Sequence, residues 1–266
     1  MKKTKEELIE IFNETVNSIH VGGYKDCKGD WHELEKPSQT ITYKTVKCLK
    51  NRKDYPRFDE EIIYAQEIDS FRKAEEFKGK CCVLNMASFS NPGGGVTRGS
   101  RAQEEDLCRR STLYEALPQD AYPIPLFGGL YTKSVTVFKN AQSYSPSSNP
   151  FSCSIVSVPA LRKPELDKNG RMLEDDIKII KGKIRAILRI AILGGHYNLV
   201  LGAFGCGAYG CNPKDVAQAF RDVLIEKEFY LAFKEVCFAI IEDKNSRGRN
   251  LQPFKEICTL KLQKIK

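Results

Sequence analysis

The chain has 266 residues, of which 41% are hydrophobic, 10% aromatic and 29% charged, and these proportions exclude a mostly disordered or fibrous protein. Lys and Arg number 42 against 34 Asp and Glu, a net charge of +8. Apolar runs end well short of the roughly 18 residues that a membrane-spanning helix needs, and the N-terminal stretch lacks the apolar core of a secretory signal. We therefore expect a cytoplasmic protein with no membrane partner.

The ten cysteines lie mostly in apolar runs, which is typical of small buried side chains in a reducing compartment. No two of them have the spacing C-x-x-C, and the three histidines are scattered at His20, His32 and His196. This distribution lacks the ligand spacing of a zinc site. We expect no metal and no cofactor.

The first half of the chain predicts two helices and two strands. Residues 4–19 form an amphipathic pattern that begins with a capping box and ends at a pair of glycines. Residues 39–48 alternate as a strand, and a charged connection leads to a short helix over residues 70–77, which Ser70 is expected to cap. Residues 80–88 are a continuous apolar run, typical of a buried parallel strand.

The remaining elements continue the alternation of strands and helices. They are a helix over residues 103–117, strands at 135–138 and 154–158 with a Ser- and Pro-rich turn at 143–150 between them, a helix over 174–193, a strand near 198–204, a helix from Pro213 and a last strand at 236–241. This order predicts an α/β fold with a mixed sheet sandwiched between helices, whose ligands bind beyond the carboxyl ends of the strands. We expect one domain over residues 1–266, with residues 1–79 as an N-terminal extension packed on a core of residues 80–260.

A glycine-rich loop follows the strand near residue 200 and leads into a helix. Residues 205–212, which we call the second glycine loop, begin with Gly205 to Gly210 in the pattern G-x-G-x-x-G. A dinucleotide-binding domain would place an acidic residue about 20 positions later, but the first acid after the next strand is Glu242, 32 positions beyond Gly210. The loop can still cradle a diphosphate beside a helix start. The alternative is a tight turn that needs glycine only for its backbone angles.

The first glycine loop, residues 91–102, contains three consecutive glycines, and seven residues after them come Gln103, Glu104 and Glu105. Adjacent residues on a helix point about 100° apart, so the two glutamates are expected to have different roles. The alternative is an acidic cluster that only stabilises the helix start.

These two loops resemble the microbial-type poly(ADP-ribose) glycohydrolases, which have a macrodomain fold and in which a triple glycine precedes the sequence QEE at this spacing. The resemblance rests on residues 83–96, 99–114 and 199–213 and extends loosely from about residue 4 to residue 255. Cys211 and Asn212 depart from it, because the family more often has Asn and then Asp there. The resemblance implies a macrodomain-like sheet with an N-terminal helical and strand extension.

The resemblance also assigns roles to residues of both loops. Glu105 would be the catalytic acid, and Glu104 would orient the distal ribose. Gly93 to Val96 would wrap the distal ribose and the diphosphate through backbone NH groups, and Tyr209 would pack on the distal ribose. The residues implied to bind substrate are Asn85, Asn91, Gly93, Gly94, Gly95, Val96, Gln103, Gly205, Cys206, Gly207, Ala208 and Tyr209.

The expected reaction is hydrolysis of the ribose–ribose O-glycosidic bonds of poly(ADP-ribose), which releases ADP-ribose. It needs a proton for the leaving oxygen and a water for the anomeric carbon. No second carboxylate is placed as a nucleophile, so we expect the substrate's own diphosphate to help orient the water.

Two alternatives remain open. One is a hydrolase of mono-ADP-ribose on protein or nucleic acid, suggested by 20 basic against 13 acidic residues in residues 161–266. The other is a macrodomain that binds ADP-ribose without catalysis, although such a domain has no need of the two glutamates. The expected ligand is ADP-ribose or poly(ADP-ribose), with ADP-ribosylated protein or nucleic acid as a further partner, and the protein is expected to be a monomer.

Overall fold

The computed structural model describes residues 3–35, 39–49, 55–242, 246 and 248–264. Within them, eight strands form one mixed sheet in the order β10-β4-β9-β8-β5-β7-β6-β3, and β1 and β2 form a separate hairpin. The strands are β1 (Gly23–Lys25), β2 (Trp31–Glu33), β3 (Thr40–Tyr43), β4 (Glu60–Gln66), β5 (Cys82–Met86), β6 (Gly129–Lys139), β7 (Pro146–Val158), β8 (Asn198–Leu201), β9 (Glu235–Ala239) and β10 (Leu260–Gln263).

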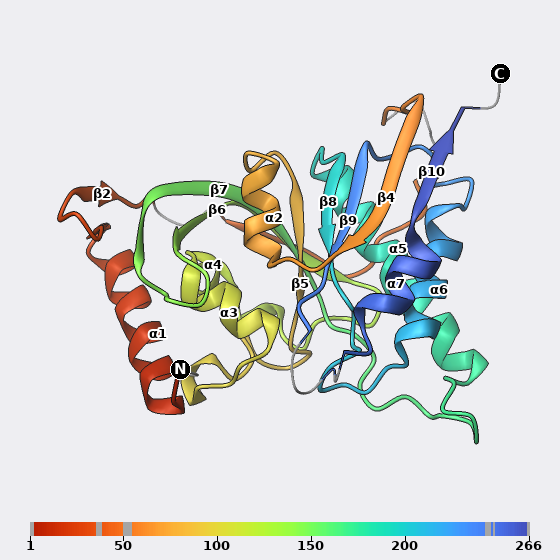
Figure 1. Cartoon of the computed structure of the whole chain (residues 1–266), viewed down its shortest axis with the longest axis horizontal. Helices are drawn as coiled ribbons and strands as arrows, with labels where there is room; N and C mark the ends of the chain where they lie inside the picture. Colours follow the sequence, from red (N-terminus) through yellow and green to blue (C-terminus); the bar gives the residue numbers. More distant parts are fainter. Residues whose placement is uncertain (1–2, 36–38, 50–54, 243–245, 247, 265–266) are drawn as a thin grey trace.

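Helices cover both faces of this sheet (Figure 1). They are α1 (Lys5–His20), α2 (Ser70–Glu76), α3 (Gln103–Arg110), α4 (Leu113–Ala116), α5 (Glu174–Leu193), α6 (Pro213–Leu224) and α7 (Leu251–Cys258), with short 3₁₀ turns η2 (Val96–Arg98) and η3 (Gln119–Ala121). Neighbouring residues of β5 face opposite layers: Leu84 packs in the cluster with α5 and α6, and Val83 packs in the cluster with α3 and α4. The predicted α/β sandwich is confirmed.

The five central strands are parallel, which determines where the loops meet. β4 pairs with β9, β9 with β8, β8 with β5, and β5 with β7, all in parallel. The carboxyl ends of these strands therefore lie at one edge of the sheet. Because β5 and β8 are neighbours, the loops that follow them are brought to the same place.

Several predicted elements are confirmed at their boundaries. Thr4 caps α1 with a complete capping box, and α5 spans the predicted residues 174–193. Asn212 caps α6 by accepting hydrogen bonds from two backbone NH groups, and Pro213 is its first residue. Seven of the ten cysteines are buried, and all ten are free thiols.

Other expectations were wrong, because pairing with neighbouring strands determined the secondary structure there more strongly than the local sequence pattern did. β4 lies in the stretch interpreted as a charged connection, where only alternate residues face the core. Another strand, β10, follows the predicted last strand and pairs with β4. Pairing with β6 extends β7 back to Pro146, through part of the predicted turn.

Three local boundaries also differ from the prediction. Asp69, not Ser70, caps α2, because its carboxylate accepts from the Arg72 NH. The helix predicted over 103–117 is broken at Ser111, which is extended and forms a bridge with Val137 of β6. The strand predicted over 39–48 is described only as β3, residues 40–43.

Two further features of the described residues concern membrane-spanning helices and metal sites. No helix in the described ranges is long and apolar enough to cross a membrane. The same residues include no group of three or more His, Cys, Asp or Glu side chains that could hold a metal ion.

Candidate active site

Glu104 lies in the first turn of α3, with its side chain turned toward the end of β5. Its Oε2 accepts a hydrogen bond from the backbone NH of Ser88 at 2.7 Å, and its Oε1 accepts from Asn85 Nδ2 at 3.3 Å. The residue is only 3% exposed. Burial raises the pKa of Glu104 to about 7, against the hydrogen bonds that lower it, and the charge of Glu105 adds to the rise.

Glu105 turns to the first glycine loop instead. Its Oε1 accepts from the backbone NH of Gly95 at 2.8 Å. Its Oε2 is buried and has no hydrogen-bond partner among the described residues. The two carboxylates therefore contact different groups, as positions one residue apart on a helix predict. An acidic cluster that only stabilised the helix start would have no reason to bury both of them.

The triple glycine is explained by a close approach of the loop to both carboxylates. A Cβ on Gly94 would lie 2.5 Å from Glu105 Oε1 and 2.9 Å from Glu104 Oε2. Gly94 also has a φ of +61°, a conformation that side chains other than glycine rarely adopt. Only glycine allows the loop to pass this close to the glutamates.

The NH groups of the first loop are largely used by the protein itself. The NH of Gly94 donates to the Asn91 carbonyl, that of Gly95 to Glu105, and that of Val96 to the Gly93 carbonyl. In this conformation the first loop therefore does not offer these donors to a ligand, in contrast to the expected wrapping of the diphosphate. The loop acts instead as a support for Glu105.

Asn85 and Gln103, both implied to bind substrate, have protein partners. Gln103 Oε1 accepts from the Met86 NH at 2.9 Å, and its Nε2 donates to the Leu84 carbonyl at 2.6 Å, so the amide joins α3 to β5. Asn85 is fully buried between Glu104 and Ser157, but its Oδ1 has no hydrogen-bond partner among the described residues. Asn91 is exposed at the start of the first loop.

The second glycine loop differs from the first in that several of its backbone NH groups have no acceptor among the described residues. Gly207 and Ala208 are exposed, and the NH groups of residues 207–209 donate to no group within the described part of the chain. Cys206 and Gly205 lie half-buried below them, and the Gly205 carbonyl accepts from the Cys211 NH. A run of unpaired backbone donors beside the start of α6 is suited to an anion.

Tyr209 connects the second loop to the glutamates. Its half-buried side chain packs against the core cluster of α5 and α6. Burial raises the pKa of its phenol, the negative charges of Glu104 and Glu105 add to the rise, and the charge of Arg162 opposes it. The phenol of Tyr209 is thus within the electrostatic influence of both glutamates of α3.

Tyr122 was not found from the sequence, because it lies in a short segment without a motif or a periodic pattern. Its hydroxyl is buried and has no hydrogen-bond partner among the described residues. Burial raises the pKa of Tyr122 above its usual range, and the nearby charge of Glu104 adds to this. The Tyr122 hydroxyl and Glu105 Oε2 are thus two buried polar atoms without a partner among the described residues, and the charge of Glu104 acts on the phenol.

Two buried arginines of α3, the helix that carries the glutamates, bind it to neighbouring elements. Arg109 is fully buried and donates to the carbonyls of Leu8 in α1 and Ser100 in the first loop, at 3.1 and 2.6 Å. Arg110 pairs with Asp69 and with Asp106, at 2.9 and 2.8 Å. These contacts hold α3 in one position relative to α1, α2 and the loop, and no sequence motif indicated them.

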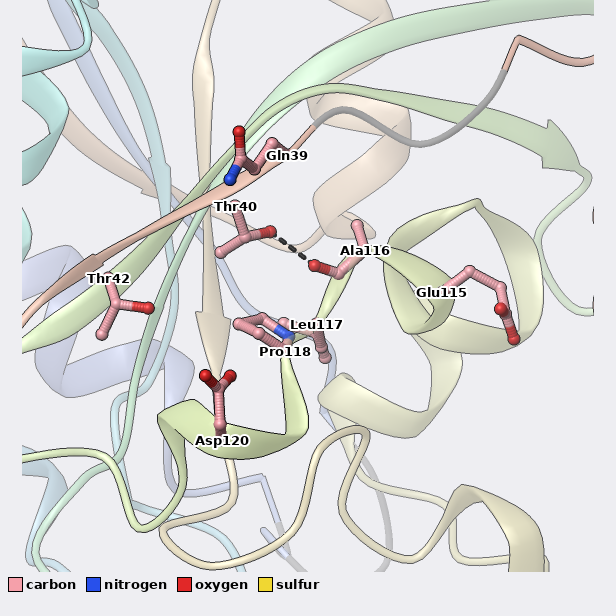
Figure 2. A pocket seen from close by; sticks show the side chains of 8 residues that line it. All are labelled: Gln39, Thr40, Thr42, Glu115, Ala116, Leu117, Pro118 and Asp120. Carbon is pink, nitrogen blue, oxygen red and sulfur yellow. Dashed lines mark hydrogen bonds between the residues drawn. The ribbon is translucent and has the colours of Figure 1, made fainter.

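A cavity of about 470 Å³ lies elsewhere, between β3 and the segment after α4 (Figure 2). Thr40 donates to the Ala116 carbonyl across it, and Glu115 and Asp120 contribute carboxylates. None of its eight lining residues is a predicted site residue or a basic side chain. An acidic lining would repel a diphosphate, so this cavity is unsuited to the expected ligand.

Residues 13–147 match the family described as microbial-type PARG, catalytic domain. No curated protein matches the chain significantly.

Solved structures are similar over most of the chain. The poly(ADP-ribose) glycohydrolase of Thermomonospora curvata, bound to the inhibitor ADP-HPD, is 25% identical with a TM-score of 0.79, over 94% of this chain and 99% of that one. The enzyme of Deinococcus radiodurans, in complex with ADP-ribose, is 29% identical with a TM-score of 0.66, over 77% of this chain and 86% of that one.

Proposed function

The chain belongs to the microbial-type poly(ADP-ribose) glycohydrolases, and from this we propose that it hydrolyses the ribose–ribose O-glycosidic bonds of poly(ADP-ribose) with Glu105 as general acid. The product released is ADP-ribose. The observation that carries the residue assignment is the Glu105 carboxyl group. One of its oxygens is held by Gly95, and the other is buried with no partner among the residues described.

The chemistry requires a proton at the leaving ribose oxygen as the anomeric carbon becomes oxocarbenium-like. Glu105 Oε2 is the free position from which that proton is donated, because Oε1 is already bonded to the loop. Once deprotonated, the same carboxylate can accept a proton from the attacking water. The substrate diphosphate helps to orient this water.

Glu104 is assigned to the distal ribose. Both of its oxygens already accept hydrogen bonds, which suits a group that orients a hydroxyl better than one that transfers a proton. With a pKa of about 7, it is partly protonated at neutral pH and can both donate to and accept from a ribose hydroxyl. Asn85 Oδ1 and the Tyr122 hydroxyl, which have no partner among the described residues, are assigned as further polar contacts of the ribose.

The diphosphate is assigned chiefly to the second glycine loop, at the NH groups of Gly207, Ala208 and Tyr209. Gly205 and Cys206 form the base of that loop, and Tyr209 packs on the distal ribose. In the first loop, Gly93 to Val96 shape the ribose pocket, and Asn91 lies at its rim. Gln103 serves as a link between α3 and β5 rather than as a ligand contact.

We place this enzyme in the cytoplasm, as a monomer and a single domain over residues 1–266. Ten free thiols, seven of them buried, suit a reducing compartment. Residues 1–79 contribute α1, which Arg109 binds, and two strands of the main sheet, which supports their folding with the rest of the chain.

The test is incubation of the purified protein with poly(ADP-ribose), beside the Glu105→Gln, Glu104→Gln and Glu10→Gln variants. Glu10 is exposed on α1 and serves as a matched control. We expect ADP-ribose release by the wild type and by Glu10→Gln, and a loss of at least about 100-fold in kcat for Glu105→Gln. A Glu105→Gln variant with more than a tenth of wild-type turnover would refute the acid assignment. Release of ADP-ribose from a mono-modified protein or nucleic acid, but not from polymer, would favour mono-ADP-ribosyl hydrolysis.

A further inference from the structure

Residues 161–173, which we call the excursion, lie between β7 and α5. They are hydrogen-bonded to the second glycine loop and to α6. The Lys163 NH donates to the Tyr209 carbonyl at 2.8 Å, and Cys211 Sγ donates to the Leu161 carbonyl at 3.3 Å. Arg162 lies between these two attachment points. Its backbone is therefore held on both sides against the loop assigned to the diphosphate.

The far part of the excursion is fastened as well. Asn212 Nδ2 donates to the Gly170 carbonyl at 2.7 Å, and the Met172 NH donates to Asp215 Oδ2 at 2.8 Å. Arg171 pairs with the same buried Asp215 carboxylate. The excursion is thus a fixed part of the wall beside the second loop.

Its charge is positive, with four basic residues against Glu165 and Asp167. Arg171 is neutralised by Asp215, but Arg162 and Lys163 are exposed and form no ion pair with any residue that the structure describes. Two adjacent free cations next to a diphosphate-binding loop attract a second anionic group. In poly(ADP-ribose), the nearest such group outside the bound unit is the diphosphate of the neighbouring unit.

We propose that Arg162 and Lys163 form a subsite for the diphosphate of the neighbouring ADP-ribose unit of the polymer. This inference rests on the proposed function. Arg162 is placed by its backbone attachment, and its charge acts on the same Tyr209 phenol as the charges of Glu104 and Glu105.

The test compares two substrates, free poly(ADP-ribose) and ADP-ribose that carries a neutral aryl leaving group on the distal ribose. The aryl conjugate has one diphosphate and no neighbouring unit. For the double variant Arg162→Gln/Lys163→Gln, we expect KM for polymer to rise about fivefold with kcat retained, and KM for the conjugate to stay unchanged. The slope of log(kcat/KM) for polymer against log[salt] should become shallower by about 1 for each phosphate contact removed.

Two control variants make this result specific. Lys25→Gln/Lys28→Gln removes the same charge at two exposed lysines in and after β1 that form no ion pair with any described residue, and it should leave both substrates unaffected. β1 pairs with β2, which lies at the opposite end of the molecule from α6 in Figure 1. Arg162→Lys/Lys163→Arg preserves the charge and should restore the KM for polymer.

The proposal is overturned if the Gln variant weakens both substrates equally, which would assign the cations to the bound unit's own diphosphate. It is also overturned if the Gln variant changes KM for neither substrate, or if it changes KM only for ADP-ribosylated nucleic acid. If the wild type cleaves neither substrate, the proposed function fails separately. The subsite is then judged by affinity for polymer against monomeric ADP-ribose, which the Gln variant should lower for polymer alone.

Discussion

The backbone NH of Gly95 donates to Glu105 Oε1 at 2.8 Å, and this bond joins the first glycine loop to the helix that follows it. The loop thereby holds one carboxylate oxygen and leaves the other, Oε2, buried and without a partner in the part of the chain that the structure describes. Loop and acid are thus one structural unit. Changes in the loop backbone should affect catalysis even where they touch no substrate atom.

Gly94→Ala tests this unit. The new Cβ would lie 2.5 Å from Glu105 Oε1, so the carboxylates must shift, and we expect kcat to fall by about 100-fold while the fold persists. Gly22→Ala is the matched control, because Gly22 has a similar positive φ of +76° but no atom within 4 Å of the added Cβ. Gly22→Ala should cost about 1 kcal/mol of stability and leave activity intact. Equal kinetics for the two variants would contradict the close-approach argument.

The raised pKa of Glu104 predicts a pH dependence of stability. The pKa is about 7 in the folded protein against 4.5 for an unperturbed Glu, so between these pH values the folded state binds more protons than the unfolded state. The free energy of unfolding should therefore fall as the pH rises from 4.5 through 7, by about 3 kcal/mol from this residue.

Glu104→Gln should remove this contribution, whereas Glu10→Gln, at an exposed site, should keep it. Urea unfolding at a series of pH values measures the difference between each variant and the wild type. An unchanged pH profile for Glu104→Gln would show that this carboxyl group is not the source.

Tyr122→Phe and Tyr144→Phe are expected to act in opposite ways. The Tyr122 hydroxyl is buried and has no partner within the described ranges, so its removal should leave stability unchanged or raise it by about 1 kcal/mol. If the hydroxyl binds ligand, as proposed, the KM for polymer should rise severalfold. The Tyr144 hydroxyl donates to Asp106 Oδ1 at 2.6 Å, so its loss should cost about 1–2 kcal/mol with less effect on KM. For both variants, thermal unfolding measures the change in stability and initial rates measure the change in KM.

Asn212→Ala should destabilise the second loop and α6 together. The side chain caps α6 through the NH groups of Lys214 and Asp215, and its Nδ2 binds the Gly170 carbonyl. We expect a loss of about 1–2 kcal/mol, measured by chemical denaturation, and a higher KM. Asn212→Asp keeps the cap but loses the Gly170 bond, so it should recover most of the stability. A stable Asn212→Ala protein would argue that the cap is dispensable.

Sequence reasoning succeeded where the signal is short-range. The capping box at Thr4, the cap at Asn212 and the limits of α5 depend on residues a few positions apart, and all three are confirmed. It failed at β4 and β10, whose pairing depends on segments about 200 residues apart in the chain. A short polar-looking strand carries too weak a periodic signal until its neighbours are in place.

The same division holds for the site. The sequence alone determined the two loops, the glutamate pair and the family they resemble, because glycines and carboxylates at this spacing have few other uses. Only the tertiary structure decided which NH groups are free, that the charge of Glu104 acts on the Tyr122 phenol, and that the backbone beside Arg162 is bonded to Tyr209 and Cys211. It also decided that α1 supports α3, through a bond from Thr15 to the Arg109 carbonyl across 94 residues. A backbone donor is free or used according to the acceptor that packing brings to it, and that acceptor can come from anywhere in the chain.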